Sequence, residues 1–135
     1  MNDATPPPRS LDELRHRVAE QQREATPPTF RIDVRPDRER VVVSPEGDVD
    51  LATVDRIAAQ LDELAGSGFP VVVLDLRGVT FMDSTGVSLL VRQSARDDVE
   101  VRLVDGREPV SRLIDLTGVR EVLRFVAADD TPPRP

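Results

Sequence analysis

Four consecutive residues carry the clearest chemistry of this sequence: Asp83, Ser84, Thr85 and Gly86. They stand between a continuous apolar run and a segment whose apolar residues recur at helical spacing, so we expect them to open a helix. The first backbone N–H groups of a helix lack partners, and its dipole places about half a positive charge there. A hydroxyl at this point could carry a phosphate that the helix end stabilises. Asp, Ser and Thr are also frequent helix caps, and by itself the motif favours simple capping.

Acidic residues are expected to flank this motif in the folded chain. Asp48 and Asp50 follow a predicted strand, and loops at the strand ends of an α/β sheet gather at one edge, although both are also typical of turns and caps. A phosphate on Ser84 would add ~−1.5 to −2 charges, which these carboxylates and Asp83 would repel. The fold would tolerate the exposed charge, whereas a partner bound to this loop would have to bury or oppose it. Asp75, within an apolar strand, is either hydrogen-bonded to a loop or functional.

The composition excludes several classes of chemistry. All 18 basic residues are arginine, which removes a P-loop lysine, a Schiff-base lysine and a lysine general base. With no cysteine and a single histidine, the chain offers no thiolate nucleophile and no cluster for a metal, and no cofactor is implied. The net charge of -7 argues against nucleic acid and anionic membranes as partners. No apolar run suits a membrane span or a signal peptide, so we expect a cytoplasmic protein.

The hydrophobic pattern predicts strands that alternate with helices, which is typical of an α/β fold. The first two strands read as an antiparallel hairpin connected by residues 36–40, and the third has the continuous apolar character of a covered parallel strand, so we expect a mixed sheet. Residues 46–50 should bend the chain into the first helix, and the residues just before Asp83 should form a loop. Pro109 suits the first turn of the last helix and Gly118 its C-terminal cap. The expected strands are 30–35, 41–45, 71–76, 100–104 and 123–126, and the expected helices are 54–64, 85–96 and 108–116.

Both ends of the chain are predicted to lie outside a single domain at residues 30–127. Residues 1–29 form a proline-rich extension in which Ser10 and Glu13 make a capping box, so a short helix is expected there. Its lone His16 is expected to be solvated. Residues 128–135 are polar and proline-rich and are expected to be disordered.

Four segments, taken in order, resemble the STAS domain and more narrowly the bacterial anti-sigma factor antagonists. They are residues 47–50, 72–76, 79–87 and 116–119. The most specific part is Asp83 to Gly86 with the apolar pair Phe81 and Met82 before it. The resemblance covers about residues 30 to 127. It implies a mixed sheet with helices largely on one face, an acceptor serine at the start of the second helix, and no catalytic activity.

The resemblance also implies a regulatory role by partner switching. Unphosphorylated antagonists of this family bind an anti-sigma factor that is also a serine kinase, and so free the sigma factor. Phosphorylation by that kinase abolishes binding, and a separate serine phosphatase restores it. By motif position the acceptor is Ser84, with Thr85 as the alternative. The partner-binding environment of the switch would consist of Asp48, Asp50, Asp75, Asp83, Thr85 and Gly86.

Other interpretations compete with this one. A STAS module that is never phosphorylated, such as a scaffold in a stress-signalling complex or a transport-associated subunit, would keep the same residues. An enzyme with Ser84 as nucleophile would lack the G-x-S-x-G motif, and its only histidine would lie in the extension. A phospho-aspartate receiver centred on Asp75 would lack its lysine. We therefore expect no enzymatic activity.

Overall fold

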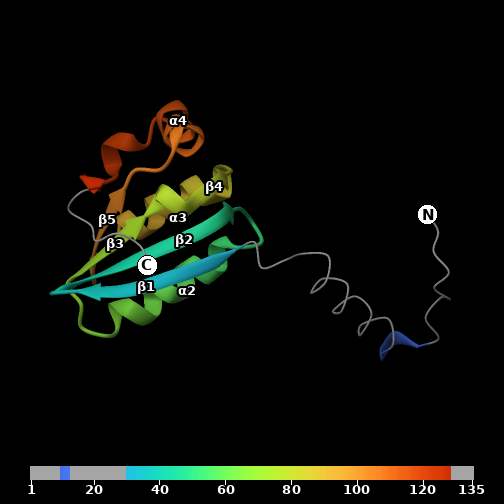
Figure 1. Ribbon diagram of the computed structural model, residues 1–135, viewed down its shortest axis with the longest axis horizontal. Coiled ribbons are helices and arrows are strands. Elements are labelled where there is room, and N and C mark those ends of the chain that lie inside the picture. The colour runs from blue at the N-terminus through green and yellow to red at the C-terminus, as the bar shows by residue number, and fades with distance from the viewer. Residues whose placement is uncertain (1–9, 13–29, 129–135) are drawn as a thin grey trace.

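The computed structural model describes residues 10–12 and 30–128, which form the elements labelled in Figure 1. Within these residues six strands and three complete helices follow one another, joined by two short 3-10 turns. The strands are β1 (Arg31–Asp37), β2 (Arg40–Val49), β3 (Val71–Asp75), β4 (Val79–Met82), β5 (Glu100–Val104) and β6 (Phe125–Val126). The helices are α2 (Val54–Ala65), α3 (Ser84–Ser94) and α4 (Glu108–Thr117), and the 3-10 turns are η1 (Leu76–Gly78) and η2 (Arg120–Val122).

The strands form one mixed sheet in the order β1-β2-β3-β5-β6, with β4 paired to β2 off this path. β1 runs antiparallel to β2, and every other strand pair is parallel. The α/β fold with a mixed sheet is therefore confirmed. The predicted long hairpin connection is wrong, because the strands extend to Asp37 and Arg40 and leave a two-residue turn. Pro36 can lie inside β1 because β1 is an edge strand.

Strand β2 serves two parallel partners in succession, and this arrangement positions the site. Its first part, Arg40 to Val43, pairs with β3, and its last part, Gly47 to Val49, pairs with β4. The register shifts between Gly47 and Asp48, and η1 carries the chain from β3 to β4. The prediction that residues 46–50 bend away and that residues before Asp83 form a loop is therefore wrong. The pairing of β2 with β4 joins segments that are far apart in the sequence. The short, mostly polar segment around Asp48 therefore does not indicate a strand by its own residues.

All three helices contribute to one apolar core on a single face of the sheet. In Figure 1 the strands β1, β2 and β3 lie in front of α2 and α3. The core includes Ile57 and Leu61 of α2, Leu90 of α3 and Ile114 of α4, each at most 1% exposed. The predicted helices are confirmed to within two residues at their ends. Gly118 caps α4 in the left-handed conformation, with φ 75°, as expected for a C-terminal glycine.

A second, smaller apolar cluster lies on the opposite face of the sheet and consists only of strand residues. Val42, Val73 and Val104 form it, with Val71 and Val126 packed against them. Of the predicted N-terminal helix, the described residues Leu11 and Asp12 are helical. The rest of that helix with His16, and residues 129–135 of the tail, lie outside the described residues. None of the helices in the described ranges has the length and apolar character needed to cross a membrane.

Candidate functional site at the start of helix α3

Asp83 is the N-terminal cap of α3 and takes an extended backbone conformation, with φ −112° and ψ −169°. Its Oδ1 accepts hydrogen bonds from the N–H groups of Thr85 at 3.0 Å and Gly86 at 3.3 Å, and from the Thr85 hydroxyl. The Thr85 hydroxyl is the main cause that lowers the pKa of Asp83, with smaller support from the two backbone N–H groups against partial desolvation. The amides that the sequence suggested for a phosphate are therefore already occupied by a carboxylate of the chain itself.

The two candidate hydroxyls differ in what they contact. The Thr85 side chain is half-buried, and its hydroxyl donates to Asp83. Ser84 is exposed at the first position of α3, and no group in the described part of the chain hydrogen-bonds to its hydroxyl. A change at the Ser84 hydroxyl would therefore leave the helix cap intact, whereas a change at the Thr85 hydroxyl would disrupt it.

The structure places the segment of Asp48 and Asp50 beside the Asp83 turn. The Asp83 N–H donates to the Val49 carbonyl at 3.3 Å, which ties the two segments together. Asp48 accepts a hydrogen bond of 2.7 Å from the Thr80 hydroxyl of β4. Asp50 accepts from the Ala52 N–H at 3.0 Å and so orders the turn into α2. The predicted juxtaposition of these acidic residues with the motif is present, and it arises from the β2–β4 pairing.

Asp75 has a structural environment that differs from that of the exposed acids. It is 0% exposed, and its carboxylate accepts from Arg77 Nε at 2.9 Å, from the second guanidinium nitrogen at 2.8 Å and from the Arg77 N–H at 3.0 Å. The Ser44 hydroxyl also donates to it, at 3.5 Å. The bond to Asp75 raises the pKa of Arg77. Asp75 therefore closes the η1 turn from inside the protein and does not face a partner directly.

Gly86 is also buried, and its role is close packing. A Cβ atom on this residue would lie 2.4 Å from Met82 Cγ and 3.1 Å from Val49 Cγ1. The absence of a side chain lets the first turn of α3 approach β2 and β4. Gly86 thus sets the position of the Ser84 turn relative to the Asp50 segment, and it does not form part of the exposed surface.

Exposed apolar side chains near this turn were missed by the sequence reasoning. Leu51 follows Asp50 and is 76% exposed, and Phe81 of β4 is 51% exposed. Leu116 of α4 is 75% exposed, and α4 contacts β4. The sequence did contain one signal of this exposure: Leu51 is apolar, although it stands in a turn, where polar residues are usual. Clustered apolar groups rimmed by charge are typical of protein-binding surfaces.

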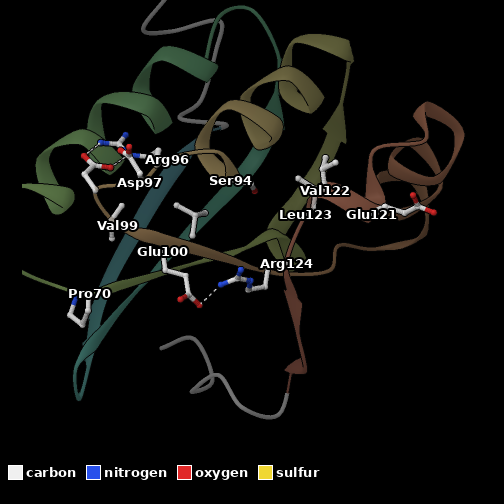
Figure 2. A pocket seen from close by; sticks show the side chains of 12 residues that line it. Pro70, Ser94, Arg96, Asp97, Val99, Glu100, Glu121, Val122, Leu123 and Arg124 are labelled. Atoms are coloured by element: carbon white, nitrogen blue, oxygen red, sulfur yellow. Dashed lines mark hydrogen bonds and ion pairs between the residues drawn. The ribbon is translucent and has the colours of Figure 1, made fainter.

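A pocket of the described chain lies at the other end of α3 (Figure 2). It has a volume of about 550 Å³ and is lined by charged residues of the α3–β5 loop and of the segment before β6. Arg96 is paired with Asp62 at 2.6 Å and Asp98 at 2.8 Å, and Arg124 is paired with Glu100 at 2.9 Å. These charges neutralise one another. Among the described residues, no group of three or more acids or histidines is arranged to hold a metal ion.

Comparisons with known proteins give the family of this chain. A family model of the STAS domain matches residues 30–130. Anti-sigma-B factor antagonists of Staphylococcus aureus (strain NCTC 8325 / PS 47) and Staphylococcus epidermidis are 26% and 29% identical over 80 residues, which cover 57% of this chain and 74% of each relative.

Solved structures show the same fold. An anti-sigma factor antagonist from Mycobacterium paratuberculosis is similar with a TM-score of 0.66 and 25% identity, over 78% of this chain and 92% of that one. The unphosphorylated antagonist SpoIIAA is similar with a TM-score of 0.58 and 20% identity, over 75% of this chain and 90% of that one. Because the family model matches residues 30–130 of the 135-residue chain, the chain belongs to the STAS domain family.

Proposed function

We propose that this protein is an anti-sigma factor antagonist that switches partners through phosphorylation of Ser84. The observation that carries the proposal is the exposed Ser84 hydroxyl beside Asp83, whose own carboxylate already binds the amides of the helix end. A phosphate on Ser84 would find these donors taken. Its charge would remain on the surface, where a partner has to meet it.

The partner would be an anti-sigma factor with serine kinase activity. Unphosphorylated, the loop offers the apolar side chains of Leu51 and Phe81 beside a small hydroxyl, which suits burial against a protein. A phosphate adds ~−1.5 to −2 charges and must be desolvated or opposed on binding. Asp48, Asp50 and Asp83 increase the local negative charge and would oppose it further. Binding would weaken while the domain keeps its structure.

The remaining parts of the cycle follow from this role. The kinase supplies the phosphoryl group, a separate serine phosphatase removes it, and the protein itself catalyses neither step. Its place of action would be the cytoplasm, where sigma factors meet RNA polymerase, and the process regulated would be transcription, for example in a stress response. Neither a cofactor nor a metal ion takes part in the role of the antagonist itself.

Phosphate mapping and a binding assay test the proposal together. The protein is incubated with ATP and the serine-kinase anti-sigma factor of the same organism, and the modified residue is located by mass spectrometry. We expect one phosphate on Ser84, none on the Ser84→Ala variant, and binding by Ser84→Ala but not by Ser84→Asp. Ser88→Asp, one turn further along α3 and also exposed, is the matched control. Equal affinity of wild type and Ser84→Asp would contradict the switch.

The second candidate is a STAS interaction module that is never phosphorylated. The cap itself favours it, because the hydrogen bonds from Thr85 and Gly86 to Asp83 give the motif a complete structural role. In that case a scaffold would bind its partner through the same surface. Absence of phosphate on residues 83–88 after kinase treatment, with binding retained, would select this alternative. A phosphate on Thr85 in place of Ser84 would keep the switch and change the acceptor.

A further inference from the structure

Strand β1 borders the sheet, and within the described chain no strand lies beyond its outer edge (Figure 1). Pro36 shows which residues of β1 face outward, because a residue without an N–H cannot be one of those that exchange hydrogen bonds with β2. Backbone groups alternate between the two sides of a strand, so Ile32 and Val34 also direct their N–H and C=O groups outward. No turn or loop of the described residues bonds to these groups.

The same two residues add apolar surface to this edge. The side chains of Ile32 and Val34 pack against the core under the helices and are only half-buried. An added strand would cover the rest of them. Outward backbone groups beside apolar side chains form a template for the addition of another strand. Pro36 shortens this template by one donor, whereas Ile32 and Val34 keep theirs.

We propose that a second copy of this chain binds at this edge, with the two β1 strands antiparallel and Val34 opposite Val34 of the other copy. The two Val34 residues would then exchange both of their backbone hydrogen bonds. Each Ile32 N–H would donate to the Pro36 carbonyl of the other copy, and only the bond from Pro36 would be missing. The apolar side chains of Ile32 and Val34 would meet across the joint and continue the core face from one sheet into the other.

The charge pattern of β1 points to a second copy as the partner and fixes this register. The other face of the strand carries side chains that alternate in sign, namely Arg31, Asp33, Arg35 and Asp37. With Val34 at the centre, each Arg31 lies opposite an Asp37 and each Asp33 opposite an Arg35, so the antiparallel strand is complementary to itself. A shift by two residues in either direction would place Asp33 against Asp33 or Arg35 against Arg35.

These charges select the register and do not drive the association. Within one chain they are already paired, at distances of 2.9 to 3.1 Å: Arg31 with Glu46, Arg35 with Asp33, and Asp37 with Arg40. The backbone bonds and the apolar contact hold the two copies together. Because one short strand supplies the contact, we expect a weak dimer that depends on concentration. The proposal goes beyond the role of Ser84 and does not depend on it.

Two complementary variants of the full chain test the register by sedimentation velocity over a concentration series. Asp33→Arg and Arg35→Asp each place like charges opposite one another, and each should raise the dissociation constant of the dimer about tenfold or more. Mixed in equal amounts, the two variants again oppose unlike charges and should form a heterodimer with about the wild-type affinity, which also shows that both are folded. Arg92→Asp, an exposed change of equal charge on α3, is the control and should dimerise as the wild type does.

Val34→Pro tests the backbone ladder, because the Val34 N–H points away from β2 and the single chain loses no hydrogen bond. It should weaken the dimer about tenfold or more. In the wild type the Val34 N–H should exchange with solvent more slowly as the concentration rises, whereas the Arg35 N–H, which faces β2, should not change. A wild-type chain that stays monomeric throughout the series would overturn the proposal. A dimer that Val34→Pro and both charge variants leave unchanged would also overturn it and place the contact on another face.

Discussion

Asp83 and Thr85 are joined twice, because Asp83 Oδ1 accepts hydrogen bonds from both the hydroxyl and the backbone N–H of Thr85. This double contact closes the first turn of α3 and engages the hydroxyl of the half-buried Thr85. It leaves Ser84, the residue between them, as the hydroxyl that faces solvent. This division of roles lets one short motif cap a helix and still leave a hydroxyl exposed to solvent.

The cap should make part of the stability depend on pH. Asp83→Ala should lower the free energy of unfolding at pH 7 by about 0.5 to 2 kcal/mol, because the N–H groups of Thr85 and Gly86 lose their acceptor. The pKa of Asp83 is lowered in the folded state, so its contribution is complete above the unfolded-state value of ~3.9 and is lost as the pH falls through the folded-state value.

Urea unfolding of wild type and variant at several pH values checks this expectation. The difference between the two should shrink as the pH falls below ~4. Asp83→Asn is the control, because its amide oxygen still accepts from the helix end but does not titrate there. A difference between wild type and Asp83→Ala that stays constant down to pH ~2 would rule out the carboxylate as the source.

A negative charge at Ser84 should leave the fold intact. Ser84→Asp should change the free energy of unfolding by less than ~0.5 kcal/mol, because the residue is exposed and no described group bonds to its hydroxyl. Ser88→Asp should give a similarly small change. Thermal or urea unfolding of both variants checks this. A loss of several kcal/mol for Ser84→Asp alone would contradict this expectation, and weaker binding by that variant would then reflect unfolding and not a changed surface.

The close approach at Gly86 predicts a specific coupling. Gly86→Ala should destabilise the protein by about 1 to 3 kcal/mol through overpacking against Met82 and Val49, even though alanine favours a helix. In a Met82→Ala background the same substitution should cost less, because the space taken by Met82 Cγ is then free. A double-mutant cycle by urea unfolding measures this coupling. Equal costs in both backgrounds would show that the two residues do not compete for space.

The Asp75–Arg77 ion pair should respond unequally to loss of either partner. Arg77→Ala should cost about 2 to 4 kcal/mol, because the 0% exposed carboxylate then loses its guanidinium. Asp75→Asn should cost only about 1 kcal/mol, because Arg77 is 36% exposed and can turn to water while the amide oxygen still accepts from the Arg77 N–H. Equilibrium unfolding of the two variants tests the order. A larger loss for Asp75→Asn than for Arg77→Ala would indicate that the buried Asp75 carboxylate is stable without the Arg77 guanidinium.

Much of the fold could be predicted from the sequence because its signals are local. The apolar spacing of α2, α3 and α4 fixes which face of each helix is buried. Pro109 marks the start of α4 because its backbone is restricted to a helical φ, and Gly118 marks the end because its backbone can adopt the left-handed conformation. The capped turn before α3 was also predictable, since the Asp83 side chain bonds to residues only two and three positions away.

Only the tertiary structure decided how these parts form a site. Strand β4 forms because β2 continues past its pairing with β3 and its last residues hydrogen-bond to β4. The residues of β4 alone do not indicate this pairing. That pairing brings Asp50 beside Asp83 and leaves Phe81 exposed. The structure also shows that Asp75 is buried, whereas Asp48, Asp50 and Asp83 remain at least partly accessible to solvent. By itself the sequence determined a helix that begins at a serine, whereas non-local hydrogen bonds and packing determined which residues lie beside that serine.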